Sequence, residues 1–313
     1  MKLPSLLFWV RHSPASALSL SLSLFLLPGL ALHQQPTTIS PTPSTPVSGS
    51  PSELFARVVD NQKRSEIQLD LYERTQRVER RRTAGDKDPL GAESWRVFPV
   101  GTGVGKIALS PDGKPVTAES YRNDLEKLEK YLTWITQDGS SQKEAYARAE
   151  RKRRERFELL EATHEAFVFS FKGKELRGDR TLLRYDMAPN PSYRPTSRNT
   201  VIFTKVRGTI WIDQESSELA KIDGSVTEDF SIGLFLAKVF KGSHFMEERY
   251  EVAPGVWEPT FDQYDFDGRK FMMPFSIHER TFYSDYKRVG PPKEALEVVR
   301  AELSKMQASM PAK

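Results

Sequence analysis

The chain contains no cysteine. A sequence without thiols excludes disulfide-stapled domains, thiol enzymes and thiolate metal sites. It also excludes a bacterial lipoprotein acylated at its own N-terminal cysteine. If the protein is exported, its stability must therefore come from its core alone, and 313 residues are enough to build a large one.

Histidine is scarce, and the familiar catalytic patterns are missing. The five histidines are His12, His33, His164, His244 and His278. Their wide spacing gives no H-E-x-x-H or equivalent zinc pattern. Asp262, Asp265 and Asp267 lack the spacing of a calcium loop, and no serine lies in a G-x-S-x-G elbow. We therefore predict no metal, no cofactor and no enzymatic activity.

A strong excess of one charge is also missing. Lys+Arg total 46 and Asp+Glu total 42, so the formal net charge is only +4. This balance predicts no nucleic-acid partner. One basic run, Arg148 to Arg156, could form a patch for acidic lipids or nucleic acid. The favoured interpretation is a solvated helix face with i,i+4 pairs such as Glu150 with Arg154.

Only one long apolar run occurs, from Ala17 to Leu32, and it follows Lys2 and Arg11 in a segment without acids. The run is short and rich in serine for a membrane span. It predicts a signal peptide over 1–31 that is cleaved after Ala31, with an uncleaved membrane anchor as the alternative. Cleavage would leave a periplasmic protein without a stable membrane span. Residues 32–50, rich in Pro, Ser and Thr, are expected to form a disordered linker.

The stretch "VGTGVGK" superficially resembles a phosphate-binding loop. A G-x-x-x-x-G-K-[ST] loop ending at Lys106 needs glycine at position 100 and a hydroxyl at 107, where the chain has Val100 and Ile107. The segment then runs into a turn, not into the helix that a phosphate loop requires. We interpret it as a strand or bulge loosened by glycine, and the sequence gives Lys106 no role in function.

Helices are expected at several places. Ser50 to Glu53 reads as a capping box that opens an amphipathic helix with Leu54 and Phe55 on its apolar face. Helical spacing also predicts a helical insertion over 117–163, in two helices, and a C-terminal helix and tail over 291–313. The polar segment 66–82 could be helix or strand. We favour a strand from about Leu69 that pairs with 94–109.

From Ala166 onward, short alternating segments separated by turns predict an antiparallel meander. Pro254-Gly255 and Asp267-Gly268 are expected hairpin turns. In the segment 230–240, apolar residues occupy both the odd-numbered and the even-numbered positions, so we expect one strand covered on both sides. The fold class is therefore mainly β (α+β).

Apolar side chains recur on one face of these predicted strands. They could form an ordinary filled core, or they could line a cavity that helices cover only in part. The candidate ligand-binding residues, called the apolar stripe below, are Phe167, Phe169, Phe171, Ile210, Ile212, Leu234, Leu236, Phe271, Met273 and Phe275.

Three segments carry a resemblance to a known family: Trp211 to Asp213 before a turn, the returning strand Leu219 to Val226, and Val256-Trp257-Glu258-Pro259. Together they resemble the LolA-like periplasmic proteins, the outer-membrane lipoprotein-sorting proteins and their relatives. The resemblance implies a domain over 51–290 in which a curved antiparallel sheet forms a half-open β-barrel covered by helices. It also implies that the concave apolar face holds acyl chains or another apolar ligand.

These observations lead to two functional hypotheses. The first is a non-enzymatic periplasmic binding or carrier protein for an apolar small molecule, lipid, acyl chain or lipoprotein. The second, which the sigma-factor regulators of the same group suggest by resemblance, is an envelope regulatory protein that binds a partner polypeptide in the same groove. An enzyme is the third class, and no set of residues supports it.

Overall fold

The computed structural model describes residues 51–197, 199–232, 237–271 and 273–309. The predicted signal peptide and linker, and Leu234 and Leu236 of the apolar stripe, lie outside these residues. The described chain divides into two compact units. Unit 1 comprises residues 67–150 and 279–309, and unit 2 comprises 51–66 and 151–278. Three elements have residues in both units, namely α1 (Pro51–Leu69), α3 (Ser140–Ala166) and β12 (Met273–Arg288).

Unit 1 contains an antiparallel sheet in the order β3-β2-β1-β12. Its other strands are β1 (Tyr72–Arg80), β2 (Gly91–Pro99) and β3 (Val104–Ser110). Val78 lies opposite Glu93 on one side and Thr281 on the other. The predicted pairing of 69–82 with 94–109 is confirmed for the part that lies in β2, whereas residues 104–109 lie in β3, which pairs with β2 and not with β1. The first helix, however, continues to Leu69, so the strand begins three residues later than expected.

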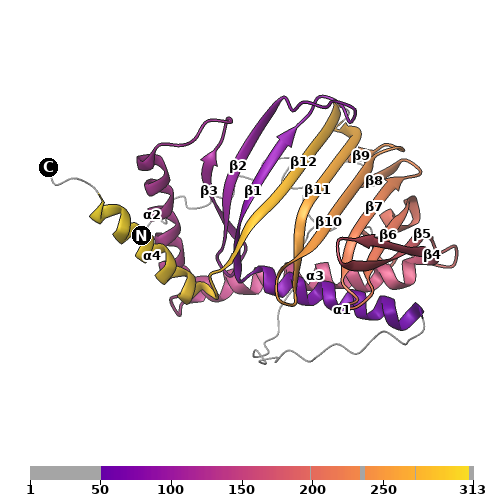
Figure 1. Cartoon of the computed structure of the whole chain (residues 1–313), viewed down its shortest axis with the longest axis horizontal. Coiled ribbons are helices and arrows are strands. Elements are labelled where there is room, and N and C mark those ends of the chain that lie inside the picture. Colours follow the sequence, from indigo (N-terminus) through magenta and orange to yellow (C-terminus); the bar gives the residue numbers. More distant parts are fainter. Residues whose placement is uncertain (1–50, 198, 233–236, 272, 310–313) are drawn as a thin grey trace. The chain divides into compact units, whose positions relative to one another are not determined.

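Two helices pack beside this sheet, α2 (Ala118–Ile135) and α4 (Pro292–Ala308), and Figure 1 shows them side by side. The Thr117 hydroxyl accepts a hydrogen bond from the Ser120 N–H at 3.1 Å, so the predicted helix start is confirmed. The α2 residues at helical spacing meet Phe98 and Ile107 in one core cluster. The predicted C-terminal helix is confirmed as α4.

The glycine-rich stretch forms the turn between β2 and β3. Val100 donates its N–H to the Gly103 carbonyl at 3.0 Å. Gly101 and Gly103 have φ angles of 78° and 139°, which side chains rarely allow. Lys106 lies within β3, as predicted, but the glycines make a hairpin turn and not a bend within one strand.

Unit 2 contains an antiparallel meander. Its strands are β4 (Phe167–Arg177), β5 (Arg180–Pro189), β6 (Val206–Asp213), β7 (Leu219–Val226), β10 (His244–Ala253) and β11 (Val256–Lys270), with the 3-10 helix η2 (Asn199–Lys205) between β5 and β6. Hydrogen bonds join the strands in the order β3-β2-β1-β12-β11-β10-β7-β6-β5-β4, with β8 and β9 to the side. The end strands of this order, β3 and β4, are not paired with each other among the described residues. The expected α+β class with an open antiparallel sheet is confirmed.

Two local predictions in unit 2 are wrong. The segment 230–240 is not one strand but the short strands β8 (Phe230–Ile232) and β9 (Ala237–Val239), which pair with each other. Asp267-Gly268 is not a turn, because β11 continues to Lys270. Gly268 is needed there because the Lys238 carbonyl and the Phe275 ring occupy the space of a side chain. The other predicted turn, at Pro254-Gly255, is confirmed.

Helix α1 covers one face of the unit 2 strands. The Phe55 ring stacks on Phe169 with centroids 3.9 Å apart and meets Tyr185 edge-on at 5.1 Å. Leu54 and Val58 lie in the same core cluster. Further along the helix, the buried Asn61 amide donates to the backbone carbonyls of the β6–β7 turn. Ring contacts and the hydrogen bonds donated by the Asn61 side chain together hold α1 on this sheet.

Candidate functional site

The described part of the apolar stripe divides into buried and exposed residues. Phe167, Ile210 and Ile212 are buried in the unit 2 core, and Phe169 packs against them, half-buried. Because the α1 residues contact this group directly, this part of the stripe is packed against a helix.

The other stripe residues are more accessible. Phe171 on β4 is 54% exposed, and its ring meets Tyr185 at 5.3 Å. Phe271 and Met273, at the turn between β11 and β12, are 59% and 68% exposed, and Phe275 is half-buried. The structure therefore separates the stripe into two accessible places, one on β4 and one at this turn.

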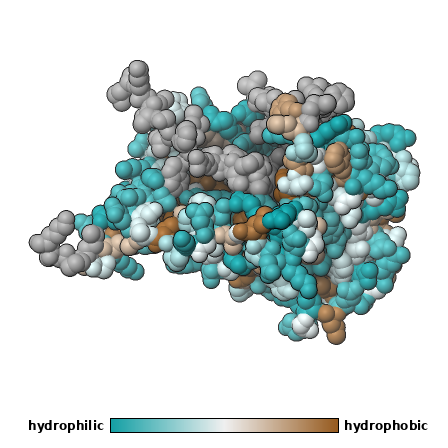
Figure 2. All heavy atoms as spheres, turned by 90° about the horizontal axis from the view of Figure 1, so that it is seen from above, coloured by the Kyte–Doolittle hydropathy of each residue, from teal (hydrophilic) through white to brown (hydrophobic). Residues whose placement is uncertain are grey.

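Exposed hydrophobic residues are scattered on the face of the molecule seen in Figure 2. On the face in Figure 2, hydrophobic residues form small separate groups among hydrophilic ones. Large exposed apolar side chains gathered at one place mark interaction surfaces more often than scattered ones do. The turn between β11 and β12 is such a place.

Basic residues flank this turn. Arg269 and Lys270 end β11 and are exposed, and Lys238 on β9 lies opposite Arg269. Asp229 accepts a hydrogen bond from the Lys241 N–H and pairs with Lys238 at 2.8 Å, and the hydrogen bond with Lys238 lowers the pKa of Asp229. We call Arg269, Lys270, Phe271 and Met273 the β11–β12 tip. Its chemistry combines apolar and cationic side chains.

A second feature is a group of charges in unit 1, called the charged cluster: Arg74, Arg80, Glu93, Lys106 and Glu279. Alternation along β1 and the strand register place all five on one face of the sheet. Arg80 binds both acids, with Nη1 2.5 Å from the Glu93 Oε1 and Nε 3.1 Å from the Glu279 Oε1. Glu279 is buried, and desolvation raises its pKa although Arg80 opposes the shift.

Lys106 behaves differently from Arg80. Desolvation, followed by repulsion from Arg74, lowers the pKa of Lys106 to about 8. Within the described residues, Lys106 makes no ion pair or hydrogen bond, and the Nη1 of Arg74 is buried without a hydrogen-bond partner. Arg74 instead lies over the Tyr283 ring, 5.8 Å from its centroid. Two cations of the cluster therefore have no acid bound to them.

Unit 2 buries an acidic cluster of its own, formed by Asp213, Glu218, Glu247, Arg249 and Glu258. Arg249 donates to the Glu247 carboxylate and to the Trp257 carbonyl, at 2.9 and 2.8 Å. Desolvation raises the pKa of Glu218 to about 7, against the attraction of Arg249 and Arg64. Glu218 can therefore take up or release a proton near neutral pH.

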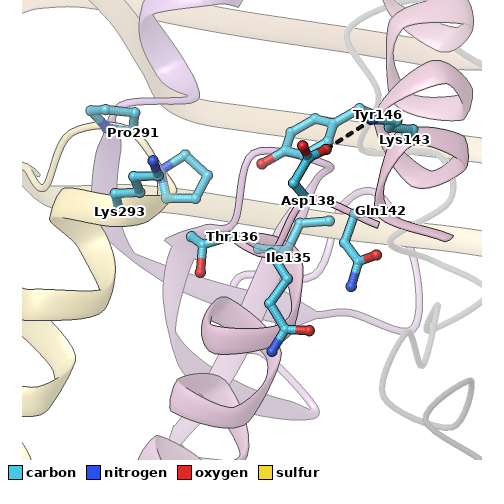
Figure 3. Close-up of a pocket in the computed structure, with 10 residues that line it drawn as sticks. Ile135, Thr136, Asp138, Gln142, Lys143, Tyr146, Pro291 and Lys293 are labelled. Atoms are coloured by element: carbon cyan, nitrogen blue, oxygen red, sulfur yellow. Dashed lines mark ion pairs between the residues drawn. The ribbon is translucent and has the colours of Figure 1, made fainter. Parts of the chain in front are cut away.

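Figure 3 shows a pocket in unit 1, formed by the end of α2, the start of α3 and the start of α4. Its volume is about 360 Å³, and it is lined by Ile135, Thr136, Gln137, Asp138, Gln142, Lys143, Tyr146, Pro291, Pro292 and Lys293. Lys143 and Asp138 pair with each other at 2.9 Å, and both are exposed. Because these charges already neutralise each other at the surface, the pocket offers a ligand mainly apolar contact.

Sequence reasoning missed both charged features. Lys106 and Glu218 carry no motif, and the pKa of each is altered mainly by desolvation, which depends on how the whole chain packs around it. One available signal was the placement of Arg74 and Arg80 on the same side of β1 as Val78, which is buried. Charges at such positions indicate that the face is not a simple apolar core.

No helix in the described part of the chain is long and apolar enough to span a membrane. Among those same residues, no group of three or more His, Asp or Glu side chains could hold a metal ion. No protein-family model matches the chain, and no curated protein sequence matches it. The resemblance to LolA-like proteins therefore stays a prediction.

Proposed function

We propose that the chain is a non-enzymatic periplasmic binding or carrier protein that holds an apolar ligand, such as a lipid, an acyl chain or a lipoprotein, against the sheet of unit 2. The observation that carries the proposal is the gradient along β4. Phe167 is buried, Phe169 is half-buried, and Phe171 is 54% exposed on the same strand. An alkyl chain laid beside Phe171 would bury its own surface, at about 0.8 kcal/mol per methylene group.

The β11–β12 tip supports the same proposal. A lipid carrier must load or unload at a bilayer, whose surface accepts apolar side chains below anionic headgroups. Phe271 and Met273 supply the apolar part, and Arg269 and Lys270 supply the positive charge. Surface lysines and arginines near an anionic bilayer contribute about 1 kcal/mol each.

Uptake of a fluorescent fatty acid by the purified chain tests the proposal. We expect Phe171→Asp to lower uptake about tenfold or more, because a charge at the binding surface must be desolvated without a partner. Leu176→Asp is the matched control. Leu176 lies on the same strand but is already 78% exposed, so its replacement should leave uptake unchanged. Absence of dye uptake by the wild-type chain would exclude the carrier proposal.

The second candidate, an envelope regulatory protein, would bind a polypeptide on the same surface. Residues at the edge of a sheet can pair with an added strand, and β4 is the end strand of its sheet. Incubation with a membrane extract separates the two candidates. Lipid that co-purifies with the chain supports the carrier, and one reproducible polypeptide in its place supports the regulator.

A further inference from the structure

The charged cluster of unit 1 holds more positive than negative charge. Arg74, Arg80 and Lys106 give three positive charges, whereas Glu93 and Glu279 give two negative charges. Cations that are partly withdrawn from water are costly unless an anion lies close to them. The cluster therefore lacks at least one negative charge.

Arg80 uses both of the available acids. It lies 2.5 Å from Glu93 and 3.1 Å from Glu279 and so bridges the two carboxylates. Glu73, the acid next to Arg74 in sequence, points to the opposite face of the sheet, where Arg96 binds it at 2.6 Å. Among the described residues, Arg74 and Lys106 are thus the two cations of this face that form no direct ion pair with an acid.

These two residues lie in one row across three strands. Arg74 on β1 is opposite Val97 on β2, and Val97 is opposite Lys106 on β3. Two strand spacings separate the backbones of Arg74 and Lys106 by about 10 Å. Both side chains are long enough to reach a group held between their charged ends, farther from the sheet than the side chain of Val97, which is already covered. Lys106 is half-buried, so such a group can enter from solvent.

We propose that Arg74 and Lys106 form a binding site for a phosphate group. A phosphate monoester carries nearly two negative charges at neutral pH, which matches the two uncompensated cations. The planar guanidinium of Arg74 presents donors suited to phosphate oxygens, and the ammonium of Lys106 acts as a point charge. The phosphate could be free, as inorganic phosphate or a small ester, or it could be the headgroup of an amphiphile.

The altered titration of Lys106 agrees with an unfilled anion site. Arg74 and Arg80 lower the pKa of Lys106, and Glu93 and Glu279 raise it, but desolvation dominates and the pKa is about 8. A bound phosphate stabilises the charged form of the amine and must raise this pKa toward its ordinary value of 10.5. The site lies within unit 1 and does not depend on the apolar ligand proposed for unit 2.

Isothermal titration calorimetry of the purified chain with inorganic phosphate and with glycerol 3-phosphate tests the site. We expect binding by the wild type, at least tenfold weaker binding by Lys106→Met and by Arg74→Gln, and retained binding by Lys106→Arg. The matched control is Lys114→Met, because Lys114 is an exposed lysine in the turn after β3. Acetate, with a single charge, should bind more weakly than phosphate.

Lysophosphatidic acid distinguishes the two sources of the phosphate. If lysophosphatidic acid binds tenfold more tightly than glycerol 3-phosphate, and Lys106→Met loses this binding, the site is for a lipid headgroup. If the two ligands bind equally well, the site is for free phosphate. The pKa of Lys106, followed by NMR of labelled lysine, should rise when phosphate is added. The proposal is overturned if phosphate neither binds nor shifts this pKa, or if Lys106→Met, with an unchanged circular dichroism spectrum, binds phosphate as well as the wild type does.

Discussion

The two units have the same strand geometry, but one face of the unit 2 sheet is an apolar core, whereas one face of the unit 1 sheet carries charged residues. On the unit 2 face beneath α1, rings and aliphatic side chains pack together, with Phe55 stacked on Phe169. On the unit 1 face that holds the charged cluster, Arg80 bridges Glu93 and Glu279, while Lys106 and Arg74 form no direct ion pair within the described part of the chain. Strand alternation therefore decides which residues share a face, but not whether that face becomes a core or a site. The chemistry of the residues that share it decides that.

The largest loss of folding stability is expected when a side chain is truncated in the unit 2 core beneath α1. Phe55→Ala should lower the free energy of unfolding by about 3–5 kcal/mol, because it leaves a void beneath α1 and removes two ring contacts. Urea denaturation measures the change. Phe271→Ala, at a residue 59% exposed, should change stability by less than about 0.5 kcal/mol. Equal losses in the two variants would show that the α1 interface is not a filled core.

A smaller, pH-dependent change in folding stability is expected when Glu218, in the acidic cluster of unit 2, is replaced. The pKa of Glu218 is about 7 in the fold and near 4.5 when unfolded, so its ionisation opposes folding as the pH rises from about 4.5 through 7. Glu218→Gln should therefore be more stable than the wild type at pH 8, by about 1–3 kcal/mol, and the difference should vanish near pH 4.5. Glu215→Gln, at an exposed position in the same turn, should show no such pH dependence. A constant difference at all pH values would contradict the raised pKa.

The smallest effect, with the opposite pH dependence, is expected at Lys106 in unit 1. Its pKa is about 8 in the fold and near 10.5 when unfolded, so its protonation opposes folding as the pH falls from 10.5 through 8. In phosphate-free buffer, Lys106→Met should gain about 1 kcal/mol over the wild type below pH 8, a value reduced because Lys106 is partly exposed to solvent. The gain should disappear toward pH 10.5. Urea denaturation across this range checks the sign, and a loss of stability below pH 8 would show that Lys106 has an acidic partner.

Much of the fold could be predicted from local sequence. Helical spacing over 117–163 predicts α2, in which Leu125, Leu128 and Leu132 recur on one face after the Thr117 cap, because helical periodicity and capping involve only neighbouring residues. The pairing of β1 with β2 followed from two adjacent strands joined by a turn-rich segment. Both are interactions between residues close in the chain.

The errors arose where distant residues decide the outcome. Gly268 reads as a turn residue, yet it lies in a strand paired with Val239, where the Lys238 carbonyl and the Phe275 ring leave no room for a side chain. The run 230–240 reads as one buried strand, yet it forms two short strands that pair with each other and with the end of β11. Alternation cannot reveal such partners, since it describes one strand at a time.

The same limit applies to the functional surfaces. The apolar stripe was identified as a set of inward-facing positions, but its division into residues beneath α1 and residues left exposed depends on where the helix packs. The sequence predicts that Lys106 is a strand residue without a role in function, and its backbone does lie in β3. Its interest comes from Arg74, which is 32 positions away in sequence and two strands away in the sheet.

The position of β4 at the end of its sheet has a consequence for aggregation. The segment Phe167 to Phe171 is apolar and rich in aromatic residues, and an unpaired strand edge of this composition can template the addition of other chains. The strand shifts register between Phe171 and Gly173, and Lys172 and Lys174 follow within the next three residues. A bulge and two lysines placed directly after such a segment act as gatekeepers. They allow an apolar segment to lie at the end of the sheet without making the protein a seed for fibres.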